Sequence, residues 1–167
     1  HVLKHCLKRF LISKFDEQLL FMNNYYYSQK YSAYANRKIV DGYVMQSHGC
    51  YITNFAMILS YFNDSAFYPD QMLDFLQKKG YVYFDARVAN KGLCDAAGFK
   101  LRFDYRPTPK VGEITYGIHQ VYFGPIGHWV LDHPIIPNVI IDPYDGQIKP
   151  FNSFSYTGQT RYFMGKK

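Results

Sequence analysis

The chain has 167 residues, of which 48% are hydrophobic and 19% are charged, with 19 Lys and Arg against 13 Asp and Glu. This length suits one compact domain with a sizeable core and leaves little room for two. The low charged fraction excludes an intrinsically disordered chain, and the longest apolar stretches, such as 55–59, are too short to cross a bilayer. We therefore expect a single soluble, globular unit.

The net charge is +6, but the basic residues are spread along the chain and form no block of five. An anionic partner, such as cell-wall polymer, and an ordinary solvated surface both account for this charge. Nucleic-acid binding through the interleaved tyrosines lacks a recognisable motif. We expect neither nucleic acid nor a membrane as a partner.

Residues 3–22 place large apolar side chains at helical intervals, and residues 23–36 are rich in Tyr, Ser and Asn. We expect residues 1–36 to form an N-terminal helical arm or linker and residues 37–167 to form the compact domain. The chain starts at His1 without a signal-peptide pattern. We therefore expect it to be part of a larger polypeptide.

Three helices are predicted in the first half of this domain. An apolar helical face runs from Cys50 to Phe62 and is ended by the turn formers at 63–65. A second helix is opened by Pro69, runs to about Lys79 and is ended by Gly80, and a third is predicted over 88–97.

Short strands are predicted in the second half. Residues 99–105 alternate between apolar and polar side chains, which is typical of a half-buried strand. Further strands are predicted at 116–123, 128–131 and 139–142, with a hairpin tip at Asp145-Gly146 before 147–149. Helices followed by an antiparallel sheet indicate the α+β class.

Cys50 is the candidate nucleophile because it follows a Gly turn at the start of a predicted helix, where the free amide groups and the helix dipole favour the thiolate. A thiol in this position needs a base and a group that holds the base. His128 begins one predicted strand and Asp142 ends the next, so antiparallel pairing brings them within hydrogen-bond reach. Gln46 is a candidate oxyanion-hole donor beside the Cys50 amide.

Each residue has an alternative interpretation. Cys50 is otherwise a buried core thiol, His128 a structural histidine and Asp142 a turn former before Pro143. Trp129 is expected to shield the His–Asp bond or to pack in the core rather than to bind sugar. Three cysteines without CxxC spacing argue against a zinc ribbon or a disulfide framework, and leave one disulfide with a leftover thiol or three reduced cysteines as alternatives. Asp132 and Asp145 are the alternative carboxylates to Asp142, and His119 and His133 the alternative bases to His128. His48 lies two residues before Cys50 and is a further candidate to modulate the thiol. We interpret the other two cysteines, Cys6 and Cys94, as structural.

Three segments together resemble the C39-like papain-fold cysteine peptidases. Residues 46–61 (QSHGCYITNFAMILSY) are similar to the nucleophile helix of that family, residues 127–131 (GHWVL) to its histidine strand, and residues 140–146 (IIDPYDG) to its Asp-Pro turn. They occur in the order of the family and span about residues 40–150. The family commonly places its oxyanion Gln five residues clear of the Cys, whereas only three residues separate Gln46 from Cys50.

The resemblance implies a papain-like fold with Cys50 as nucleophile, His128 as base, Asp142 as the orienting acid and acyl transfer through a thioester. It implies no metal or other cofactor. Within the family, one branch trims double-glycine leader peptides, and another occurs in bacterial surface proteins, phage lysins and tail proteins. The charge and the aromatic residues favour cleavage of peptidoglycan peptides, hence an extracellular or virion-associated location. Leader-peptide processing and an inactive papain-fold binding module are the alternatives.

Overall fold

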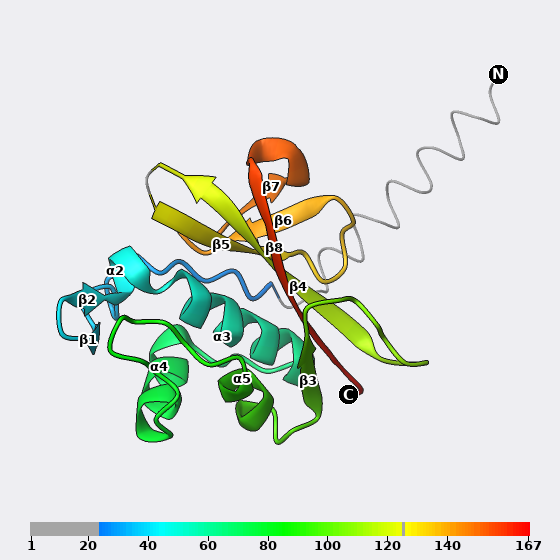
Figure 1. Ribbon diagram of the computed structural model, residues 1–167, viewed down its shortest axis with the longest axis horizontal. Helices are drawn as coiled ribbons and strands as arrows, with labels where there is room; N and C mark the ends of the chain where they lie inside the picture. Colours follow the sequence, from blue (N-terminus) through cyan, green and yellow to red (C-terminus); the bar gives the residue numbers. More distant parts are fainter. Residues whose placement is uncertain (1–23, 125) are drawn as a thin grey trace.

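The computed structural model describes residues 24–124 and 126–167. Helices pack on one face of an antiparallel sheet, so the described part of the chain has the expected α+β class (Figure 1). The sheet within these residues has six strands in the order β3-β8-β4-β5-β6-β7. No helix in the described ranges is both long enough and apolar enough to span a membrane.

The helices follow the predicted order. They are α2 (Met45–His48), α3 (Cys50–Asn63), α4 (Pro69–Lys78) and α5 (Lys91–Ala96). The predicted ends of α3 and α4 are confirmed, because Asp64 adopts a left-handed conformation after α3 and Gly80 has positive φ after α4. The third helix is shorter than expected because Val88 forms an isolated bridge with Val82.

The central helix α3 is buried on nearly all sides. It lies between the sheet, α4 and α5, and its residues 52–62 are all buried (Figure 1). A helix that is apolar around most of its circumference is stable only when it is covered in this way. Together with the inward face of the sheet, α3 forms the main core, which fixes the position of the first turn of the helix.

The strands of the sheet pair in antiparallel fashion. Four of the predicted strands and the predicted hairpin are present, and a separate two-stranded hairpin precedes α2. The sheet consists of β3 (Leu101–Asp104), β4 (Ile114–Phe123), β5 (Ile126–Asp132), β6 (Val139–Asp142), β7 (Gln147–Pro150) and β8 (Tyr156–Gly165), and the hairpin of β1 (Lys38–Val40) and β2 (Tyr43–Val44).

Strand β8 was not predicted from the sequence, although it lies inside the sheet, between β3 and β4. Only its last three residues are buried, and its first half carries the polar run Thr157-Gly158-Gln159-Thr160. A strand without period-two alternation has no clear sequence signal. Its position in the sheet is determined by hydrogen bonding to the neighbouring strands, since β8 pairs with β4 along most of its length.

The described part of the segment before Arg37 packs into the domain. Tyr25 and Tyr34 are buried in the main core, and the Gln29 side chain donates a hydrogen bond to the carbonyl oxygen of Gln46. The expected boundary at Arg37 therefore does not coincide with a gap in the packing. The predicted helical pieces at 3–22 and Cys6 lie outside the described residues.

Candidate active site

Cys50 is the first residue of α3 and follows directly on the turn at Gly49. A Cβ atom at Gly49 would lie 2.5 Å from the backbone oxygen of Met45 and 2.9 Å from its sulfur, so only glycine fits the junction between α2 and α3. The first N–H groups of α3 have no partner inside the helix and point at its N-terminal end. This end is favourable for a negative charge, such as a thiolate.

His128 and Asp142 form a buried hydrogen-bonded pair, with 2.6 Å between Nε2 of the imidazole and Oδ1 of the carboxylate. The exposed fractions of the two residues are 5% and 0%. Because Leu131 pairs with Ile141, continuing the antiparallel register places Asp142 two residues along from the position opposite His128. The two strand ends therefore bring base and acid together, as the sequence predicts.

The imidazole of His128 also interacts with Cys50. Burial lowers the pKa of His128, but the hydrogen bond to Asp142 and the neighbouring Cys50 side chain outweigh it and raise the pKa to about 9. Because Nε2 is occupied by Asp142, Nδ1 is the ring nitrogen that remains for the thiol. The arrangement favours a charged imidazolium beside the Asp142 carboxylate.

Asp142 is held by more than the histidine. Its Oδ1 also accepts a hydrogen bond from the backbone N–H of Tyr144 at 2.9 Å, and its Oδ2 accepts one from Nζ of Lys149 at 2.5 Å. Lys149 reaches Asp145 as well, at 2.8 Å. Burial raises the pKa of the Asp142 carboxyl, but the hydrogen bonds from His128 and Lys149 outweigh this and lower it to about 2. The carboxylate is therefore ionised and fixed in orientation.

Aromatic rings cover the His128–Asp142 pair. The ring of Phe123 lies 5.2 Å from the imidazole and 5.0 Å from the ring of Tyr144, measured between centroids. Phe123 and Tyr144, and not Trp129, therefore shield the His128–Asp142 hydrogen bond. The indole of Trp129 instead packs against the ring of Tyr51 at 5.1 Å, next to the thiol.

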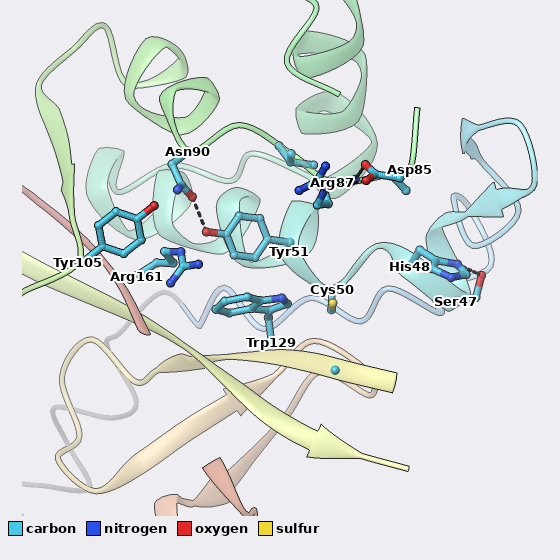
Figure 2. Close-up of a pocket in the computed structure, with 13 residues that line it drawn as sticks. Ser47, His48, Cys50, Tyr51, Asp85, Arg87, Asn90, Tyr105, Trp129 and Arg161 are labelled. Carbon is cyan, nitrogen blue, oxygen red and sulfur yellow. Dashed lines mark hydrogen bonds and ion pairs between the residues drawn. The ribbon is translucent and has the colours of Figure 1, made fainter. Parts of the chain in front are cut away.

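A cavity of about 430 Å³ opens beside Cys50 (Figure 2). It lies between the start of α3, the 85–90 loop, β5 and β8. Ser47 and His48 line one end, and Trp129 and Arg161 line the other. The nucleophile candidate thus faces a space large enough for a short stretch of peptide or a small ligand.

Gln46 is not brought together with the other three residues. It is exposed on α2, does not line the cavity, and its Nε2 donates to Oδ1 of Asn36 at 3.1 Å. The spacing explains this position, because a residue four before Cys50 falls within the short α2 helix rather than across the cavity from the thiol. An oxyanion role for Gln46 requires the side chain to leave Asn36.

The rival residues lie in other environments. His119 contacts Oδ2 of Asp132 at 2.8 Å, and His133 lies 2.8 Å from the Tyr26 hydroxyl. A second cavity, of about 420 Å³, is lined by Asp132 and His133 but by neither described cysteine. Cys94 is buried, and burial raises the pKa of its thiol. Asp145 bonds to Lys149, and the His48 ring to Ser47.

Two charged residues of the site, Lys149 and Arg161, were not predicted from the sequence. Lys149 follows the predicted hairpin tip, and the pairing of Ile140 with Lys149 and of Asp142 with Gln147 places it on the same face as Asp142. Carrying the alternation of side chains between the two faces from the strand that ends at Asp142 through the hairpin would have placed Lys149 beside Asp142. Arg161 lies in β8, for which the sequence carries no strand signal.

Comparison of this chain with known protein families, with curated proteins and with solved structures found no match. The site is therefore interpreted from its own geometry.

Proposed function

We propose that the protein is a papain-like cysteine peptidase or amidase, with Cys50 as nucleophile, His128 as general base and acid, and Asp142 as the orienting carboxylate. One observation carries this proposal: a thiol at a helix N-terminus lies beside an imidazole that a buried carboxylate holds at 2.6 Å. The resemblance of the three sequence segments to the C39-like group supports it.

The proposed reaction begins with the Cys50 sulfur as thiolate and His128 as imidazolium. The sulfur attacks the carbonyl carbon of the scissile amide, and collapse of the tetrahedral intermediate breaks the C–N bond. His128 gives its proton to the departing nitrogen, which leaves a thioester on Cys50. His128 then takes a proton from water, the hydroxide attacks the thioester, and the carboxylic acid departs as the thiolate reforms.

Asp142 has a positioning role in this reaction. It stabilises the charged imidazole and fixes the ring, while Lys149 and the Tyr144 amide hold the carboxylate itself. The backbone N–H of Cys50, at the start of α3, is a suitable donor to the oxyanion. Gln46 supplies the second donor in this proposal only if its side chain turns away from Asn36.

The proposed substrate is a peptide of bacterial peptidoglycan, and the net charge of +6 supports attraction to an anionic wall. Cleavage after a double-glycine leader is the alternative within the same chemistry. A binding module without activity is the alternative from another class, and the position of Gln46 favours it.

One set of assays separates these functions. Dye-labelled peptidoglycan and a Gly-Gly leader peptide are incubated with the wild-type protein and with Cys50→Ser, a nearly isosteric change. We expect release of dye by the wild type only. Cutting of the leader peptide without dye release would overturn the wall substrate. No turnover of either substrate, or equal turnover by Cys50→Ser, would contradict the enzyme.

A further inference from the structure

Arg161 lines the same cavity as Cys50, at the end beyond Trp129 (Figure 2). Its guanidinium lies between two aromatic rings, with its central carbon 4.7 Å from the ring centre of Tyr105 and 5.2 Å from that of Trp129. Both distances are within the range of a cation–π contact. Contact with both rings restricts the positions that the guanidinium can adopt.

The guanidinium is only partly satisfied in this position. It donates one hydrogen bond to the backbone oxygen of Thr160 at 3.1 Å and one to Oε1 of Gln159 at 3.4 Å. A guanidinium has five N–H donors, so three have no acceptor within the described residues. Neither acceptor is charged, and no carboxylate of the described chain pairs with Arg161.

The other charged groups of the cavity compensate one another. Asp85 and Arg87 both line it, and Nε of Arg87 donates to Oδ2 of Asp85 at 2.6 Å. Arg161 is therefore the cation of the described cavity wall that has no carboxylate partner. A half-buried, oriented guanidinium with unused donors binds a carboxylate through two parallel hydrogen bonds more readily than it binds a neutral amide.

We propose that Arg161 is the specificity-determining residue of this cavity and binds a carboxylate carried by a residue of the substrate close to the scissile bond. The nature of the ligand, a peptide, rests on the proposed function. Trp129 lies between Cys50 and Arg161, so the carboxylate belongs to a residue near the attacked carbonyl and not to the attacked group itself (Figure 2).

Binding can be measured without turnover because Trp129 is the single tryptophan of the chain and lines the cavity. The probes are N-acetylated, C-amidated pentapeptides of alanine in which one Glu is moved through the five positions, each with a matched Gln peptide. The protein is Cys50→Ala, and the readout is the dissociation constant from Trp129 fluorescence. We expect the Glu peptide to bind about tenfold more tightly than its Gln partner at one position at least.

The variants decide whether Arg161 is responsible. Arg161→Gln, made in the Cys50→Ala background, should bring the ratio close to one. Arg37→Gln, which removes an exposed positive charge paired with Asp74, should leave it near ten. If Arg161→Gln does not fold, as judged by circular dichroism, Arg161→Lys is used, and loss of the planar fork should reduce the ratio at least threefold.

Two results would overturn the inference: equal binding of every Glu and Gln pair, or a ratio unchanged by the substitutions of Arg161. These results are separate from the test of catalysis. A carboxylate preference in a protein that cleaves no peptide would contradict the proposed function and leave the carboxylate site standing. Cleavage of peptides without any preference for a carboxylate would support the proposed function and contradict the carboxylate site.

Discussion

Asn54, one helical turn after Cys50, donates a hydrogen bond from Nδ2 to the backbone oxygen of Trp129 at 2.9 Å. Trp129 directly follows His128 in β5. This hydrogen bond ties the helix that carries the thiol to the strand that carries the base. Asn54 is fully buried, so water does not replace the bond when it is removed.

Asn54→Leu should lower both stability and turnover. The substitution leaves the Trp129 carbonyl without its donor, which costs about 1–3 kcal/mol of unfolding free energy, and loosens the spacing between Cys50 and His128. Urea unfolding and kcat/KM on a cleaved peptide measure the two effects. The matched control is Thr53→Val, because the Thr53 hydroxyl is buried without a hydrogen-bond partner in the described chain. Similar behaviour of both variants would contradict the role of Asn54.

Lys149→Met should destabilise the protein by about 1–3 kcal/mol at neutral pH, because Oδ2 of the buried Asp142 loses its cation. The pKa of the Asp142 carboxyl should rise from about 2 towards its usual value. The loss of stability should therefore shrink at pH 2, where the carboxylate takes up a proton in both proteins. Urea unfolding at the two pH values checks this.

Lys38→Met is the control for Lys149→Met. Lys38 pairs with Asp41 where both side chains are largely exposed, and such pairs contribute little. A cost for Lys149→Met no larger than that of Lys38→Met would mean that Lys149 does not hold Asp142.

The His128 pair also predicts how stability depends on pH. The pKa of His128 rises from 6.5 to about 9 on folding, so the native state binds the proton more tightly than the unfolded state. This contribution is fully present below pH 6.5 and is lost as pH rises through about 9. The lowered pKa of Asp142 adds stability above pH 3.8 that is lost as pH falls towards 2. The free energy of unfolding should therefore decline from pH 6.5 to 9.

His128→Gln isolates this contribution, because the two proteins differ at no other titratable group. The difference in unfolding free energy between wild type and variant should decrease steadily from pH 6.5 to 9. A constant difference over that range would show that His128 is neutral in the folded protein.

The helix-first order, α3 and its first residue, and the pairing of His128 with Asp142 could be predicted from sequence because each depends on local pattern. The apolar face of residues 50–62 identifies a helix, and strand ends at 128 and 142 identify neighbours in an antiparallel sheet. These features need only periodicity and turn residues.

The remainder depends on contacts between distant segments. Strand β8 is polar in its first half and is placed by pairing with β4 and β3, so Arg161 had no predicted position. The capture of the Gln46 amide by Asn36 likewise depends on how the segment before β1 folds back over α2. Tertiary placement of polar side chains leaves little trace in periodicity.

Gly49→Ala should change the position of the Cys50 thiol, although the added methyl group meets Met45 and not Cys50. The added methyl group would come within 2.5 Å of the Met45 oxygen, a backbone atom that moves only if the turn moves. We expect a cost of about 1–3 kcal/mol, as for overpacking in a core, and a slower reaction of Cys50 with thiol reagents. Unchanged stability and unchanged thiol reactivity would show that the turn does not fix Cys50.

The most direct measurement is the alkylation rate of each cysteine at pH 6, followed by mass spectrometry in wild type, His128→Ala and the control His119→Ala. We predict that Cys50 reacts at least tenfold faster than the buried Cys94, that His128→Ala removes this advantage, and that His119→Ala preserves it. Equal, slow alkylation of Cys50 and Cys94 in the wild type, or a fast Cys50 in His128→Ala, would contradict the proposed thiolate–imidazolium pair.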